Sequence, residues 1–136
     1  MNQFLNDLAT EYPSIATVFQ VGTTTQGRPI TGLRLATSQT SPTIVYIGCQ
    51  HAREWISLMT VAYIAQQLCE DYTNNPSTAL VNSFQFSLIP IVNADGYNYS
   101  ITNDRMWRKN RAENPGSSCI GGCFLFPSSF LCFQSD

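Results

Sequence analysis

The sequence predicts an α/β fold in which a mixed β-sheet is flanked by helices. Thr43 to Gly48 is a dense run of β-branched and apolar residues, typical of a strand that is buried inside a sheet on both faces. From about Glu54 to Tyr72, apolar residues recur at helical spacing on more than one face, which is typical of a helix that packs under a sheet. A second apolar run from Phe84 to Val92 follows, and the order strand, helix, strand indicates a mixed sheet.

A helix and a hairpin are expected before the first buried strand. The helix is predicted to begin at Asn2, a residue type favoured as an N-cap, and to end before Pro13, with its apolar residues on one face. The segments Val18 to Val21 and Ile30 to Leu35 are separated by a turn that contains glycine and proline. They are therefore predicted to form two strands of a hairpin.

The later part of the chain is predicted with less regular structure. Asn74 to Pro76 ends the long helix, and Pro90 makes the last strand bend or end early. From Asn93 to Gly116 the chain is polar and rich in turn residues, so loops are expected there. Residues 122–136 change abruptly to Phe, Cys and Ser without a clear period, and no structure is assigned to them.

Composition limits the classes of partner. The chain has 136 residues, of which 43% are hydrophobic and 12% charged, as in a globular domain or part of one. Its net charge of −2 argues against nucleic acid as a partner, because such binding depends on clustered Lys and Arg. Apolar runs are shorter than the roughly 18 residues that span a bilayer, and the first residues lack a signal-peptide pattern, so no membrane partner is expected.

Five cysteines cannot all pair within one chain, because their number is odd. Cys49 and Cys69 lie in apolar surroundings and are interpreted as buried free thiols. Cys119, Cys123 and Cys132 fall in the unusual C-terminal stretch.

The strongest functional signal is the string GCQHAREWIS from Gly48 to Ser57, between a predicted strand and a predicted helix. His51 and Glu54 are three residues apart at the helix start, so their side chains can point the same way and bind one Zn²⁺ ion. Arg53 adds positive charge at the same place. The alternative interpretation is a capped helix start in which Glu54 lies near the positive end of the helix dipole.

This string resembles the first zinc-ligand motif of the metallocarboxypeptidase A/B family. Three further segments resemble that family in the same order: GRPI at residues 27–30, IPIVNADGY at 89–97 and RMWRKNR at 105–111. The resemblance covers about residues 1–121 and implies the N-terminal part of a zinc exopeptidase catalytic domain. Residues 122–136 are then a divergent tail.

The resemblance implies roles for four residues. His51 and Glu54 are implied as zinc ligands, Arg53 as a substrate-contacting residue, and Arg108 as the residue that polarises the scissile carbonyl and contacts substrate. The implied reaction is zinc-dependent hydrolysis of C-terminal peptide bonds, on a peptide or protein substrate with a free C-terminus. A secreted monomer is also implied, although this chain carries no signal-peptide pattern. Asn93 to Gly96 is interpreted as a structural turn.

Departures from the family pattern leave alternatives open. His51 is the single histidine, so the family's second histidine ligand is missing from this chain, whereas catalytic zinc sites have three protein ligands. One alternative is a non-catalytic fragment or pseudoenzyme that binds peptide or zinc. Another is a binding module in which Cys119 or Cys123 replaces the histidine. Arg108 could also belong to a solvated basic face. An incomplete sheet is expected to expose an unpaired edge and an apolar face, which favours aggregation.

Overall fold

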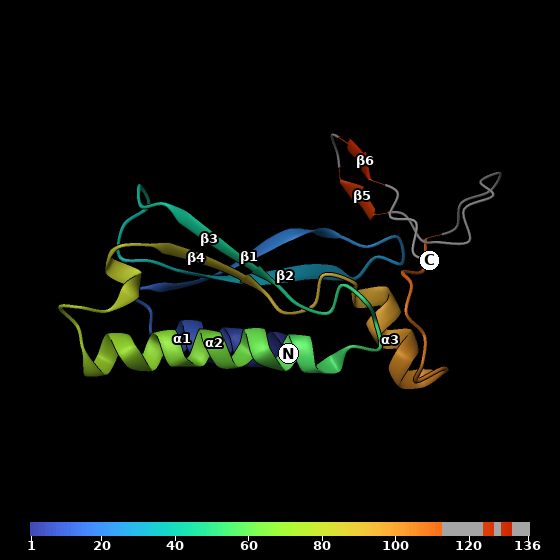
Figure 1. Ribbon diagram of the computed structural model, residues 1–136, viewed down its shortest axis with the longest axis horizontal. Helices are drawn as coiled ribbons and strands as arrows, with labels where there is room; N and C mark the ends of the chain where they lie inside the picture. Colours follow the sequence, from blue (N-terminus) through green and yellow to red (C-terminus); the bar gives the residue numbers. More distant parts are fainter. Residues whose placement is uncertain (113–123, 127–128, 132–136) are drawn as a thin grey trace.

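A four-stranded mixed sheet with two helices on one face forms most of the protein (Figure 1). The computed structural model describes residues 1–112, 124–126 and 129–131. The elements are α1 (Asn2–Glu11), β1 (Ala16–Thr23), β2 (Pro29–Leu35), β3 (Thr43–Ile47), α2 (Trp55–Asn74), η1 (Leu80–Asn82), β4 (Gln85–Ile89), α3 (Ala94–Thr102), β5 (Phe124–Phe126) and β6 (Ser129–Leu131).

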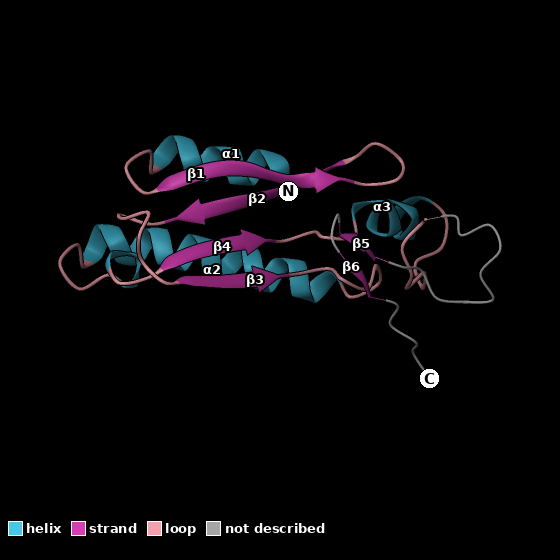
Figure 2. Ribbon diagram, turned by 90° about the horizontal axis from the view of Figure 1, so that it is seen from above, coloured by secondary structure: helices cyan, strands magenta, loops and turns pink. Residues whose placement is uncertain are grey.

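The strand order is β1-β2-β4-β3. β1 pairs antiparallel with β2, β2 antiparallel with β4, and β3 parallel with β4, so the predicted mixed sheet is confirmed. Figure 2 shows the four strands side by side from above. Because β3 and β4 are parallel, the loops that follow them leave at the same end of the sheet, which is the usual place for a site in an open α/β sheet.

The core lies between the sheet and the helices α1 and α2. Fully buried side chains come from each layer, including Leu5 of α1, Leu33 of β2, Ala65 of α2 and Leu88 of β4. The first helix, the hairpin and the long helix form where the sequence predicts them, and β4 ends at Ile89, directly before Pro90. Cys49 and Cys69 are buried free thiols, as predicted.

The first helix begins at Asn2 as predicted, but the prediction that Asn2 is its N-cap is wrong. Met1 is the N-cap, and Asn2 lies inside the helix with no side-chain capping bond at this end. A capping side chain comes from the residue directly before the helix, where it can accept from the first free N–H groups. Asn2 is already the first helical residue, so its side chain is not in that position.

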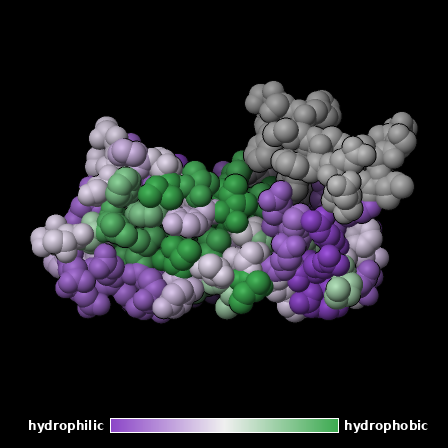
Figure 3. Space-filling view, viewed as in Figure 1, coloured by the Kyte–Doolittle hydropathy of each residue, from purple (hydrophilic) through white to green (hydrophobic). Residues whose placement is uncertain are grey.

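The prediction that β3 is buried on both faces is also wrong. Val45 is 54% exposed and Ile47 is 52% exposed, and β3 pairs with β4 alone among the described strands. Figure 3 shows apolar residues gathered over this part of the surface. On α2, Met59 of the predicted apolar pattern is likewise exposed, at 57%. Apolar β-branched residues favour a strand, but burial depends on what packs against the strand.

The predicted loop after β4 contains the helix α3, which corrects the interpretation of Asn93 to Gly96 as a turn. The side chain of Asn93 accepts a hydrogen bond from Gly96 N at 3.0 Å and caps this helix. Asn and Asp favour turns and helix N-caps by the same local hydrogen bonding, so the sequence alone does not separate the two.

Two short antiparallel strands, β5 and β6, lie within residues 122–136, to which the sequence analysis assigns no structure. Among the described residues, none of the helices has the length and apolar character required to cross a bilayer.

Candidate metal and substrate site

The predicted metal motif occupies the loop between β3 and α2. The backbone is tightly held where this loop begins. A Cβ atom on Gly48 would lie 2.6 Å from Pro90 O and 2.9 Å from Ser57 O, so glycine is required there. Cys49 has a φ of 48°, and its N–H donates to Ser57 Oγ at 2.8 Å. The close approach of Pro90 and Ser57 to Gly48 and the hydrogen bond from Cys49 therefore fix the backbone at the start of this loop.

His51 and Glu54 meet at the start of α2. The distance from His51 Nδ1 to Glu54 Oε1 is 2.9 Å, and the side chains are 34% and 47% exposed. Zinc ligands lie about 2.0–2.2 Å from the ion, so two neighbouring ligands are roughly 3 Å apart, and this pair fits that spacing. Within the described part of the chain, no cluster of three or more His, Cys, Asp or Glu side chains is suited to hold a metal. The described residues thus fit two ligands of a zinc site.

The segment around Arg108 lies against the metal motif. Ala52 N donates to Arg108 O at 3.0 Å, and Arg105 Nη1 donates to Arg53 O at 3.0 Å. Arg108 is half-buried and Arg53 is exposed. The structure thus brings together the two segments that carry the four predicted site residues, which are more than fifty positions apart in sequence.

Asn93 joins three segments and was not predicted as part of the site. Its Nδ2 atom donates to Gln50 O at 3.2 Å and to Lys109 O at 3.1 Å. The side chain is only 3% exposed. One asparagine therefore caps α3 and ties both functional segments together. Its position in the string after β4, which resembles the family pattern, was the available signal.

Asp95 is a second buried polar residue at this end of the sheet. Its carboxylate accepts from Thr24 Oγ1 (2.7 Å), Thr25 Oγ1 (3.2 Å) and Gln26 N (3.0 Å). It also forms an ion pair with Arg28 Nη1 at 2.8 Å. Burial raises the pKa of Asp95, but the hydrogen bonds from Thr24, Arg28 and their neighbours outweigh it, so the pKa lies below its usual value.

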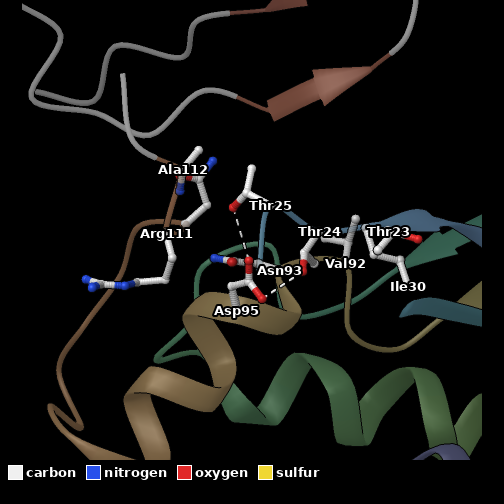
Figure 4. Close-up of a pocket in the computed structure, with 10 residues that line it drawn as sticks. Thr23, Thr24, Thr25, Ile30, Val92, Asn93, Asp95, Arg111 and Ala112 are labelled. Atoms are coloured by element: carbon white, nitrogen blue, oxygen red, sulfur yellow. Dashed lines mark hydrogen bonds between the residues drawn. The ribbon is translucent and has the colours of Figure 1, made fainter. Parts of the chain in front are cut away.

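These bonds join residues 24–28 to the start of α3, and one of them, from Arg28, comes from the GRPI segment. Figure 4 shows Asp95 pointing toward Thr24 and Thr25 across a small pocket. The pocket is lined by Thr23, Thr24, Thr25, Ile30, Val92, Asn93, Asp95, Asn110, Arg111 and Ala112. Two of the four segments that resemble the family are thus in contact through one carboxylate.

The Cys49 thiol does not act as an additional ionised group in this loop. Burial, and to a smaller extent the charge of Glu54, raises the pKa of Cys49 to about 11. The thiol is therefore protonated at neutral pH.

A mixed sheet flanked by helices, with a histidine and a glutamate paired at the start of a helix, indicates the metalloprotease class. The chain belongs to the zinc carboxypeptidase family, whose model, peptidase M14, matches residues 1–123.

Individual relatives agree with this assignment. The inactive metallocarboxypeptidase ECM14 of Arthroderma gypseum is 44% identical in an alignment of 123 positions that covers 84% of this chain and 21% of the relative. Carboxypeptidase A2 of Rattus norvegicus is 35% identical, over 88% of this chain and 29% of the relative. The crystal structure of carboxypeptidase A from Helicoverpa armigera matches with a TM-score of 0.76 and 33% identity, over 88% of this chain and 30% of that one. The chain thus spans about a fifth to three-tenths of the length of these relatives.

Proposed function

We propose that this chain supplies two zinc ligands, His51 and Glu54, to a site that hydrolyses C-terminal peptide bonds. The observation that carries the proposal is the 2.9 Å approach of His51 Nδ1 to Glu54 Oε1 at the exposed start of α2. Imidazole nitrogen and carboxylate oxygen are both ligands that Zn²⁺ accepts. When bound, zinc supplies a polarised carbonyl and an activated water for hydrolysis.

Arg53 and Arg108 are proposed as the substrate-binding residues, and Arg108 also as the catalytic one. The exposed side chain of Arg53 is suited to contact a peptide chain, because its backbone oxygen, not its guanidinium, holds it to Arg105. Arg108 is proposed to donate to the scissile carbonyl oxygen as that oxygen becomes negative. Losing one such donor typically lowers kcat by about 100-fold to 1,000-fold.

A non-catalytic role is the second candidate, and two observations favour it. Several relatives, including those of Arthroderma gypseum and Talaromyces marneffei, are named inactive metallocarboxypeptidases. His51 is the single histidine of the chain, and the described residues offer no third ligand beside the pair. In this case the chain binds zinc or peptide without turnover. A variant of this candidate uses Cys119 or Cys123 as a further ligand, and both lie outside the described residues.

The wider assignments follow from the family. We propose that residues 1–121 form part of a carboxypeptidase catalytic domain and that residues 122–136 are a separate tail. The substrate is proposed to be a peptide or protein with a free C-terminus. An extracellular monomer is proposed on the same basis.

Zinc content and hydrolysis of a blocked dipeptide with a free C-terminus test both candidates. The purified chain is expected to retain Zn²⁺, and Glu54→Ala is expected to weaken retention by at least tenfold, because one of two ligands is lost. Chelator-sensitive hydrolysis by the wild type favours the catalytic candidate. Zinc retention without hydrolysis favours the non-catalytic one. Zinc binding that is equal in Glu54→Ala and the wild type would overturn the ligand assignment.

A further inference from the structure

Arg105 lies where the metal motif meets the RMWRKNR segment, and its guanidinium makes two contacts with the motif. Nη1 donates to Arg53 O at 3.0 Å. The guanidinium carbon also lies 3.8 Å from the centre of the Trp55 ring, which is a close cation–π contact. Arg105 itself is exposed, so the hydrophobic core does not require it.

These two contacts lie on either side of Glu54 in the sequence. Arg53 O belongs to the same planar peptide group as Glu54 N. A hydrogen bond to that oxygen therefore restrains the orientation of the peptide plane that leads into Glu54. Trp55 is the next residue and the first of α2. One guanidinium therefore restrains the chain directly before and directly after the proposed zinc ligand.

The Trp55 ring is itself held in place from α3. Its Nε1 donates to Ser100 Oγ at 3.0 Å, and the single proton of that hydroxyl has two carbonyl acceptors within reach, Tyr97 O at 2.7 Å and Ala52 O at 3.1 Å. Ser100 is 2% exposed. Trp55 also contacts Tyr97 edge-on, with the ring centres 6.0 Å apart. Arg105 thus stacks on an anchored ring, which limits the positions that its guanidinium can adopt.

We propose that Arg105 is a positioning residue that holds Glu54 in the orientation needed for it to bind metal together with His51. This inference rests on the proposed zinc-ligand role of the pair. Groups that orient metal ligands typically change metal affinity by about tenfold to 100-fold when they are removed. Arg105 acts through the backbone and an aromatic ring, so an effect of about tenfold is expected.

The loss of the Arg105 charge and the loss of its orienting contacts are expected to change zinc affinity in opposite directions. A nearby positive charge repels Zn²⁺, so the loss of charge alone would strengthen zinc binding. The loss of orientation weakens it. Lys109 offers a matched control, because it is an exposed cation of the same segment, and Asn93 and Trp107 bond to its backbone oxygen and not to its side chain.

The single histidine makes a direct measurement simple. The imidazole nitrogen signals of His51 in a long-range ¹H–¹⁵N NMR spectrum have no overlap from other histidines, so Zn²⁺ titration gives the affinity at this site. The variants are Arg105→Ala, Arg105→Lys and Lys109→Ala. Arg105→Lys keeps the positive charge and a hydrogen-bond donor group. It loses the planar guanidinium that can stack on Trp55 and donate to Arg53 O at the same time, so this variant is expected to bind Zn²⁺ with intermediate affinity.

The expected result is an apparent Kd about tenfold higher in Arg105→Ala and unchanged or slightly lower in Lys109→Ala. Circular dichroism and thermal unfolding of each variant establish that the chain remains folded at the titration temperature. Equal affinity in Arg105→Ala and the wild type would overturn the inference and leave the proposed ligand pair intact. If the wild-type His51 signals do not respond to millimolar Zn²⁺, the ligand pair and this inference both fail.

Discussion

Asp95 shows how one residue determines the geometry of two segments that carry family motifs. Its carboxylate lies in the first turn of α3, where the helix dipole favours a negative charge, and it accepts four hydrogen bonds from residues 24–28. The ion pair with Arg28 is part of this set, although Arg28 is 37% exposed. The burial of a carboxylate is costly, and these bonds offset that cost.

Asp95→Asn is expected to lower the free energy of unfolding at pH 7 by about 2–3 kcal/mol, because an amide cannot accept all of the charged bonds. The folded-state pKa of Asp95 lies below its unfolded value, so its contribution is present above about pH 3.9. That contribution is lost as the pH falls through the folded-state pKa. Urea unfolding from pH 7 to pH 2.5 measures the difference between wild type and variant.

Asp7→Asn is the control for this measurement, because Asp7 is an exposed carboxylate on α1 that accepts from Gln3. Its effect is expected to stay within about 0.5 kcal/mol at each pH. A difference between wild type and Asp95→Asn that remains constant as the pH falls would contradict the assigned role of the carboxylate.

At the scale of the elements, the sequence correctly predicts the helices and strands whose formation depends on residues close together in the chain. The strands β1 to β4 and the helix α2 follow from apolar patterning, and the end of β4 follows from Pro90, because these signals act within a few residues. The helix α3 was missed because its stability comes from distant partners. Trp55 donates to Ser100 within it, and the ring of Tyr99 lies 4.9 Å from that of Trp107. Such contacts are invisible to a pattern along the chain.

The candidate site divides in the same way. His51 and Glu54 could be proposed as ligands from the sequence, because two ligand types at helical spacing, within a string that resembles a family motif, form a local signal. Asn93 and Arg105 were not predicted as site residues, because each acts on a segment more than forty residues away in sequence. A residue that joins distant segments cannot be recognised from the spacing of its neighbours in the sequence.

Asn93 allows capping and joining to be separated by mutation. Asn93→Ala removes the cap of α3 and both donors to Gln50 and Lys109, so the free energy of unfolding is expected to fall by about 2–4 kcal/mol. Asn93→Asp keeps a capping acceptor but loses both donors. If joining dominates, chemical denaturation will find the two variants similarly destabilised. An Asn93→Asp variant as stable as the wild type would show that capping alone matters.

At the scale of the whole molecule, the second face of the four-stranded sheet is covered by none of the helices that the structure describes. The helices α1 and α2 cover one face, and β3 forms an edge with exposed Val45, Tyr46 and Ile47. An exposed apolar edge strand offers unpaired backbone groups to other chains and favours self-association. We therefore expect self-association of the 136-residue chain to depend on this edge more than on exposed apolar residues elsewhere.

Ile47→Lys and Ile101→Lys form a matched pair for testing this expectation. Ile47 is 52% exposed on β3, and Ile101 is 53% exposed on α3, so the two substitutions remove similar apolar surface and add the same charge. Lysine on an edge strand opposes edge-to-edge pairing, so Ile47→Lys is expected to lower the weight-average mass at high protein concentration, as measured by light scattering. Ile101→Lys is expected to resemble the wild type. If both variants lower association equally, net charge or total apolar surface governs it, and the β3 edge has no special role.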